Sequence, residues 1–177
     1  DMAKKLAIKD LLHYEKYQEL RLTKKGTKMA LNVVRKHRLW ESLLFRMFDM
    51  SLHEIHRESE LLEHQTSDFL ADKISDYLGN PKFDPHGDPI PDENGEFTDK
   101  PSVPLADLNE KDSGVMSAVN DSSSAFLKYL DKMKISIGSR IQVLEVIEFD
   151  GSMEIKIDEQ RSLTISKTVA DNILISQ

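Results

Sequence analysis

The chain has 177 residues, of which 39% are hydrophobic and 31% charged, and its formal net charge is −7. The longest apolar runs are only a few residues, so the composition excludes a membrane-spanning protein and predicts a soluble globular one with one or two domains. The chain contains no cysteine. This excludes disulfides and thiolate metal ligands and fits a cytoplasmic location.

The charge is distributed unevenly along the chain. Residues 1–46 contain 12 Lys and Arg against 5 Asp and Glu, a balance of +7. The remainder contains 12 basic and 26 acidic residues, a balance of −14. A basic N-terminal end on an acidic body is consistent with polyanion binding at that end. A difference in helix and turn composition along the chain would give the same counts, and charge alone does not separate the two explanations.

The first 25 residues predict the end of a helix followed by a β-hairpin. Residues 1–12 have the amphipathic spacing of a helix tail, and "LLHYEKY" and "QELRLT" alternate like two short strands that end at Thr23. A helix end followed by a small hairpin is typical of a winged helix-turn-helix. An isolated hairpin would give the same pattern.

Three helices are predicted between residues 24 and 79. Thr23 is a suitable N-cap for a long helix that runs to residue 48. Ser51 and Glu54 form a capping box, which predicts that a second helix begins at residue 52. A third helix covers "SDFLADKISDYL" and ends at Gly79.

The composition then changes. All six prolines lie between residues 80 and 113, which predicts a connector with turns. A short helix follows in "SSSAFLKYLDKM", and four alternating segments predict strands at 139–149, 152–158, 162–166 and 172–176. The predicted domains are residues 1–25, the end of a winged helix-turn-helix; 26–79, a helical domain; 80–113, the connector; and 114–177, a small β-barrel.

Polar side chains at helical spacing suggest a metal site. His56, Glu60, Glu63 and His64 stand at i, i+4, i+7 and i+8 in "EIHRESELLEH", so they share one helix face. His37 and Glu41 form a second pair one turn apart, and imidazole and carboxylate groups bind divalent cations. In a chain this rich in charge, such spacing also arises on solvated helix faces. The remaining candidate, His86 in "DPHGDPIP", is expected to order a turn.

Three motifs resemble the diphtheria-toxin-repressor family of metal-dependent transcriptional regulators. "RKHRLWESLL", "EIHRESELLEH" and "GNPKFDPHGDPIP" occur in the family's order and spacing, and the likeness covers essentially the whole chain. The resemblance implies a mainly α protein with a small β-domain: the end of a winged helix-turn-helix, a metal-binding and dimerisation domain, and an SH3-like, FeoA-like barrel. It assigns Glu60, Glu63 and His64 to a primary metal site; His37, Glu41 and His56 to an ancillary site; and Asp121 as a further ligand near the barrel.

The resemblance also implies the metal and the partners. Glutamate at position 60, where the iron-responsive branch has cysteine, favours Mn²⁺, with Fe²⁺ as the next choice. The implied partners are a second copy of the chain and a palindromic double-stranded operator, with repression as the output. The front of the winged-helix domain, roughly 40 residues, lies outside this sequence, and Asp10 stands at a helix end where members often have glycine. The expected contacts with DNA phosphates are Lys16, Arg21, Lys24 and Lys25.

Two alternatives belong to other functional classes. One is a metal-sensing dimerisation module that does not bind DNA. The other is a di-metal carboxylate enzyme, but such helical bundles present Glu-x-x-His pairs, and none of His37, His56 and His64 has glutamate three residues before it. No catalytic residue is therefore predicted.

Overall fold

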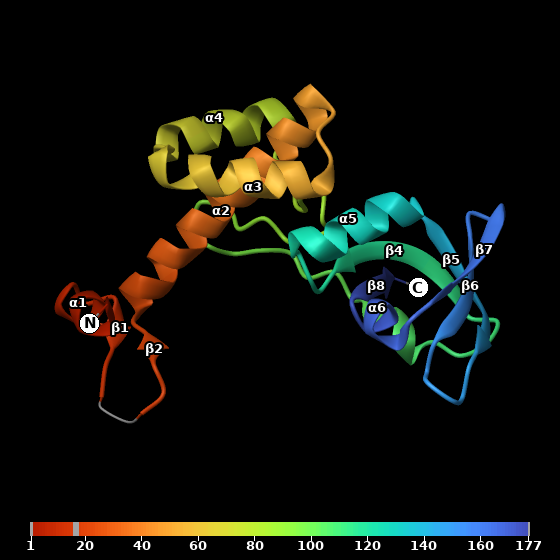
Figure 1. The fold of residues 1–177 in the computed structure, drawn as a ribbon. Coiled ribbons are helices and arrows are strands. Elements are labelled where there is room, and N and C mark those ends of the chain that lie inside the picture. Colours follow the sequence, from red (N-terminus) through yellow and green to blue (C-terminus); the bar gives the residue numbers. More distant parts are fainter. Residues whose placement is uncertain (1, 16–17, 177) are drawn as a thin grey trace.

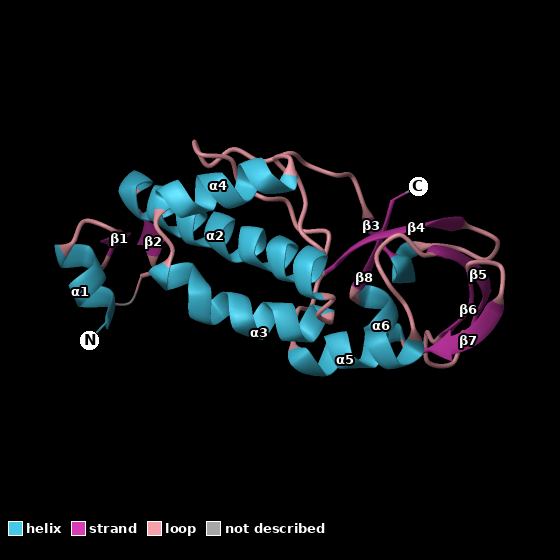
Figure 2. Ribbon diagram, turned by 90° about the horizontal axis from the view of Figure 1, so that it is seen from above, coloured by secondary structure: helices cyan, strands magenta, loops and turns pink. Residues whose placement is uncertain are grey.

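The structure, a computed structural model, describes residues 2–15 and 18–176. A small helix and hairpin lie at one end of a long helix, two further helices pack along that helix, and a curved β-sheet with its own helices lies at the far side (Figure 1). Seen from above, the helices and the sheet form two adjoining bodies with the connector running between them (Figure 2). None of the helices in the described ranges is long and apolar enough to cross a membrane.

The N-terminal and helical parts follow the capping signals of the sequence. Thr23 is the N-cap of the long helix, and Ser51 and Glu54 form the predicted capping box, in which each side chain binds a backbone N–H that the helix leaves free. Gly79, in the left-handed conformation, ends the last helix of this part. The elements are α1 (Met2–Ile8), β1 (Leu12–His13), β2 (Arg21–Leu22), α2 (Lys24–Phe48), α3 (Leu52–Leu62), a 3₁₀ turn (Glu63–Gln65) and α4 (Asp68–Leu78).

The C-terminal part is an antiparallel sheet in the strand order β3-β8-β4-β5-β6-β7. Register shifts between Met116 and Ala118 and between Val143 and Glu145 mark bulges, which bend strands and help a small sheet to curl. The elements are β3 (Val103–Pro104), a 3₁₀ turn (Leu105–Asp107), β4 (Ser113–Val119), α5 (Ser124–Met133), β5 (Arg140–Val146), β6 (Met153–Ile157), β7 (Arg161–Ile165), α6 (Lys167–Asp171) and β8 (Ile173–Ser176).

One hydrophobic core joins the helices to the sheet. Leu52 and Ile55 of α3 are buried in the same cluster as Ile141 of β5 and Ile173 of β8. Burial of these side chains removes apolar surface from water, at roughly 25 cal/mol per Å², and so holds the two bodies together. Helices that carry candidate metal ligands are therefore fixed against the β-domain.

The connector is ordered at its Asp84–Asp88 turn. The Asp84 carboxylate accepts hydrogen bonds from the backbone N–H groups of His86 and Asp88, at 2.8 and 2.9 Å. Val119 N–H donates to the carbonyl of His86 at 3.2 Å, which ties the turn to strand β4. Gly87 has φ +87°, and a Cβ added there would lie 1.9 Å from the Ser117 carbonyl oxygen. The turn thus requires glycine at this position and sits directly on the sheet.

The expected fold class is confirmed: helices with a hairpin at the N-terminal end, followed by a small β-domain. The four expected C-terminal strands correspond to β5, β6, β7 and β8, and the expected short helix corresponds to α5. Three elements have no counterpart among the predictions, namely β3, β4 and α6. The segment predicted as connector includes strand β3. Its two residues pair with β8, although one of them is Pro104.

Candidate metal centre

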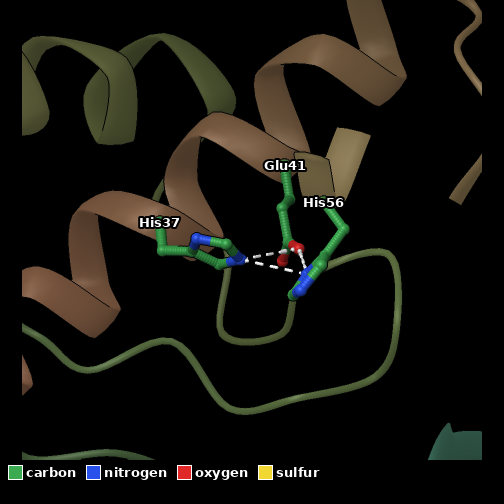
Figure 3. A group of neighbouring side chains, drawn as sticks. All are labelled: His37, Glu41 and His56. Atoms are coloured by element: carbon green, nitrogen blue, oxygen red, sulfur yellow. Dashed lines mark hydrogen bonds and ion pairs between the residues drawn. The ribbon is translucent and has the colours of Figure 1, made fainter. Parts of the chain in front are cut away.

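His37, Glu41 and His56 converge on one point between α2 and α3 (Figure 3). The Glu41 Oε1 atom lies 2.9 Å from His37 Nε2 and 2.9 Å from His56 Nδ1, and the two nitrogens are 3.3 Å apart. His37 and Glu41 are one turn apart on α2, and α3 packs beside that helix with His56 facing them. Donor atoms at such spacing could take positions around a single divalent ion.

A third imidazole reaches Glu41 from the connector. His86 Nδ1 lies 3.4 Å from Glu41 Oε2, and both side chains are 2% exposed. Asp84 is also close enough for Glu41, Asp84 and His86 to form a second, fully buried group with metal-ligand geometry. Asp84 Oδ2 has no hydrogen-bond partner among the described residues, and Arg38 Nε is 3.7 Å from it. Glu41 is therefore shared by two donor groups, one on each of its carboxylate oxygens.

The hydrogen-bond geometry of the imidazoles favours a cation. The Leu52 carbonyl, 3.3 Å from His86 Nε2, can only accept, so Nε2 carries the proton and Nδ1 faces Glu41. His37 places both ring nitrogens against carboxylates, Nδ1 at 2.8 Å from Glu63 and Nε2 at 2.9 Å from Glu41. A neutral imidazole has only one N–H, so each ring needs either a second proton or a metal ion at its other nitrogen.

The pKa shifts agree with this geometry. Burial would lower the pKa of His37, but the hydrogen bond that it donates to Glu41, with a further contribution from Glu63, raises it above its ordinary value of 6.5. The pKa of His86 is likewise raised by Glu41 and Asp84 against the effect of burial. Burial would raise the pKa of Glu41, but hydrogen bonds from the three imidazoles hold it well below its ordinary range. Burial and the neighbouring Glu41 carboxylate raise the pKa of Asp84 to about 8.

The residues assigned to the primary site lie at the outer edge of this group. Glu63 joins the two sets, since its Oε2 contacts His37 and its Oε1 lies 3.0 Å from His64 Nε2. The side chains of Glu60 and His64 are 63% and 66% exposed. Glu60 Oε1 lies 3.9 Å from His56 Nε2. Glu60 and His64 thus lie at the surface, whereas Glu63, with its side chain 14% exposed, is as buried as the ancillary residues His37 and His56.

A cavity of about 310 Å³ gives access to the centre, and it is lined by side chains of α2, α3, the connector and the loop before α5. His37, Glu41, Glu63 and His86 line it, together with Ser122 of that loop. Asp121, the neighbour of Ser122, accepts hydrogen bonds from the Ser123 N–H and hydroxyl at 2.8 and 3.1 Å. Its role as a ligand remains a prediction.

The residues expected to contact DNA lie on the hairpin and at the start of α2. Arg21 is exposed and pairs with Glu19 at 3.3 Å. Lys24 is exposed, and Lys25 donates to the Lys9 carbonyl at 3.0 Å. Lys16 lies outside the described residues. These positions remain predicted phosphate contacts.

Sequence reasoning did not place His86 and Asp84 at the candidate metal centre. His86 does order a turn, as expected, but its side chain is also buried against Glu41. Helical spacing signals ligands that share a helix, and these two residues reach the centre only because the connector folds back over α2. A histidine and an aspartate two residues apart in a proline-rich segment would have been the only available signal.

The chain matches two family models. Residues 23–92 match the iron-dependent repressor metal-binding and dimerisation domain, and residues 103–177 match the FeoA domain. No curated protein matches the chain in sequence.

Solved structures give a likeness over the whole chain. A manganese-dependent transcriptional repressor in complex with manganese is 34% identical, with a TM-score of 0.86 over 97% of this chain and 80% of that one. The manganese regulator SloR is 33% identical, with a TM-score of 0.81 over 99% of this chain and 81% of its own. ScaR with bound Cd²⁺ is 29% identical, with a TM-score of 0.82 over 99% of this chain and 82% of its own.

These likenesses span both bodies of the molecule and the connector between them, and the histidine and glutamate side chains of the centre are of the types that bind transition metals. The chain belongs to the diphtheria-toxin-repressor family of metal-dependent transcriptional regulators.

Proposed function

We propose that this protein is a DNA-binding transcriptional repressor that a divalent metal, Mn²⁺ first and Fe²⁺ second, activates for operator binding. The observation that carries the proposal is the Glu41 carboxylate, which is buried and faces the imidazoles of His37, His56 and His86. Three imidazoles and one carboxylate form a nitrogen and oxygen donor set that suits Mn²⁺ and Fe²⁺. Repressor relatives regulated by manganese support the same assignment.

In this proposal the metal replaces protons. Without metal, the imidazoles share protons with Glu41 and Glu63. His37 would hold a bound ion through Nε2, and its Nδ1–H would then donate to Glu63, which would fix the orientation of both side chains. The ion also neutralises carboxylates that would otherwise repel one another. Metal binding would thus favour the arrangement of α2 and α3 in which these side chains converge, and would shift the population toward it.

The proposed partners are a second copy of the chain and double-stranded DNA. Large apolar side chains are exposed on α2, α3 and α4, as expected of a surface that a second copy covers. They include Phe45, Phe48, Leu61, Phe69 and Tyr77. Residues 1–28 contain eight Lys and Arg against four Asp and Glu, and the described part of this segment lies at the end of the molecule that carries the hairpin, where phosphates would be bound.

A DNA-binding titration of the full-length protein tests the proposal. The probe is a duplex selected from random-sequence DNA on the Mn²⁺-loaded protein, and fluorescence anisotropy measures its affinity with Mn²⁺ or with a chelator. We expect Mn²⁺ to raise the affinity and Glu63→Gln to abolish most of that gain. Glu58→Gln is the matched control, because its carboxylate pairs with Arg57 at the surface. If DNA affinity is the same with and without metal, the protein is not a metal-activated repressor.

A further inference from the structure

The joint between α1 and α2 is closed by direct hydrogen bonds. The last carbonyls of α1 accept hydrogen bonds from the backbone N–H groups of residues 9–11, and groups at the start of α2 bind the next three carbonyls, those of residues 9–11 themselves. The Thr23 hydroxyl donates to the Asp10 carbonyl at 2.8 Å, and the Thr23 N–H donates to the Leu11 carbonyl at 3.2 Å. Lys25 Nζ donates to the Lys9 carbonyl at 3.0 Å. The segment that directly follows α1 is thus held by the N-terminal end of α2.

The Thr23 hydroxyl serves both helices at once. It donates to Asp10 and accepts a hydrogen bond from the Gly26 N–H at 2.9 Å, which is the N-cap bond of α2. Thr23 is 8% exposed, so these bonds are largely shielded from water. Asp10 has φ +57°, a left-handed conformation that Asp tolerates better than most residues and that turns the chain toward this contact.

Gly26 makes the contact a close one. A Cβ built on Gly26 would lie 2.0 Å from the Leu11 carbonyl oxygen and 2.9 Å from its carbon. These are backbone atoms, so no side-chain rotation could relieve the clash. Only glycine at position 26 lets the start of α2 approach the Leu11 backbone this closely. The pairing of Leu12 in β1 with Leu22 in β2 also holds the chain after α1 next to the chain before α2.

We propose that Thr23 and Gly26 are positioning residues that hold α1 and α2 rigidly together. A tilt of α2 at the metal centre would then move α1 and the hairpin with it as one rigid body. The inference rests on the proposed function, because α1 is the helix expected to extend into DNA. His37 lies eleven residues beyond Gly26, about 16 Å along the same uninterrupted helix. Helix α2 would then carry the tilt from the metal centre to α1.

In this proposal, transmission of the metal signal to the DNA-binding end requires a rigid joint between α1 and α2. A rigid element carries a shift from one end to the other, whereas a flexible joint would let α1 keep many orientations whatever the metal centre does. Loss of the joint should therefore uncouple DNA binding from metal binding and leave the metal centre itself intact. Substitutions at the centre would do the reverse, since they weaken metal binding and leave α1 fixed to α2.

Four variants of the full-length protein test whether Thr23 and Gly26 make the α1–α2 joint rigid. Thr23→Val keeps the shape of the side chain and removes both hydroxyl hydrogen bonds, and Thr23→Ser restores them. Gly26→Ala would favour an ordinary helix, so a loss here reports the clash with Leu11. Thr27→Val is the matched control, because Thr27 is exposed in the same turn.

The readouts are joint rigidity, DNA affinity and Mn²⁺ affinity. This sequence has no cysteine, so spin labels at Lys5→Cys on α1 and Arg46→Cys on α2 are unique within it, and any cysteine elsewhere in the full-length protein is replaced by serine. The second label is about 30 Å along α2 from the joint. Labelled chains diluted into unlabelled protein report the distance within one subunit. We expect one narrow distance distribution in the wild type, Thr23→Ser and Thr27→Val, and a broadened or shifted one in Thr23→Val and Gly26→Ala.

The same two variants should lose about tenfold or more in Mn²⁺-dependent affinity for the selected duplex. Their Mn²⁺ affinity should stay within about twofold of the wild type, as expected for distant sites, and this also shows that they fold. Unchanged distances and DNA affinity in both variants would overturn the inference. A wild type that ignores metal when it binds DNA would overturn the proposed function instead, and the distance distributions would still decide whether the joint is rigid.

Discussion

At the scale of single residues, Glu41 is the centre of the site. Its two oxygens serve two donor groups, with His37 and His56 on Oε1 and His86 on Oε2. A carboxylate in this position is the one negative charge that all three imidazoles share. Its removal should therefore affect metal binding more than the removal of any one imidazole.

We expect Glu41→Gln to weaken Mn²⁺ binding by about 10- to 100-fold or more. The amide keeps the size of the side chain but loses its charge, and its NH₂ group would face ring nitrogens that should face the metal. Isothermal titration with Mn²⁺ measures the affinity and the number of ions bound. Glu58→Gln on α3 should bind as the wild type does. Full Mn²⁺ affinity in Glu41→Gln would show that the metal binds elsewhere.

The raised pKa values of His37 and His86 predict how the metal-free protein responds to pH. A group whose folded pKa is raised stabilises the folded state below its unfolded pKa, near 6.5, and that stability is lost as the pH rises through the folded pKa. Glu41, whose pKa is lowered, contributes above its ordinary pKa of 4.5 and loses its effect only in acid. Between pH 6 and pH 8.5 the stability contributed by the histidines is therefore lost as the pH rises, and Asp84, whose pKa is raised from 3.8 to about 8, lowers the stability in the same direction up to about pH 8.

The free energy of unfolding of the metal-free protein should thus fall between pH 6 and pH 8.5, and it should fall less in His37→Gln. Urea unfolding in the presence of a chelator measures the difference between the two proteins. Saturating Mn²⁺ should reverse the trend, because metal binding needs deprotonated imidazoles and strengthens as the pH rises. Identical pH dependence in the wild type and in His37→Gln would contradict the assigned proton positions.

At the scale of elements, the sequence predicts what is local. Caps at Thr23 and Ser51 and the stop at Gly79 lie in the residues that form them, so the helices were predictable. Strand β4 was not, because "SGVMSAV" is rich in small residues and lacks clear alternation; its four last residues are all buried. His86 was missed for a different reason. Its place beside Glu41 depends on how the connector folds back, which no periodicity records.

The turn that carries His86 can be tested through Gly87. We expect Gly87→Ala to lower the free energy of unfolding by roughly 1–3 kcal/mol more than Gly79→Ala does. Both glycines have positive φ, +87° and +82°, so both variants bear the cost of a left-handed alanine. Only at Gly87 would the new Cβ meet backbone, the Ser117 carbonyl; Gly79 has nothing within 4 Å.

Urea unfolding gives this comparison, and limited proteolysis locates the damage. Cleavage in residues 81–101 should become faster in Gly87→Ala than in Gly79→Ala, because the connector would lift from β4. Equal stability of the two variants would mean that the turn does not depend on its close contact with the sheet.

At the scale of the whole molecule, one helix connects all the parts. Helix α2 begins at the hairpin, carries His37 and Glu41 in its middle, and reaches the core shared with the sheet at Leu44. The connector also links the metal centre to the sheet, since its turn contacts both Glu41 and β4. The candidate metal centre is therefore connected by ordered structure both to the hairpin and to the sheet.

This continuity predicts reciprocal coupling between metal and DNA. If Mn²⁺ raises the affinity of the dimer for its selected duplex by some factor, the duplex must raise the affinity for Mn²⁺ by the same factor, because both belong to one thermodynamic cycle. We expect a factor of about 5 to 150, the usual range for allosteric coupling. Mn²⁺ titrations with and without saturating duplex, and duplex titrations with and without saturating Mn²⁺, give the two values.

The protein concentration decides how a difference between the two measured factors is interpreted. Both titrations are made well above the dimer dissociation constant, so that metal-driven assembly does not add to the apparent DNA affinity. Under these conditions Thr23→Val should reduce both factors together, whereas Glu41→Gln should reduce them because the metal is no longer bound. If Mn²⁺ strengthens DNA binding only at concentrations where the metal-free chain is monomeric, the metal acts by assembling the dimer, and transmission along α2 is not the mechanism.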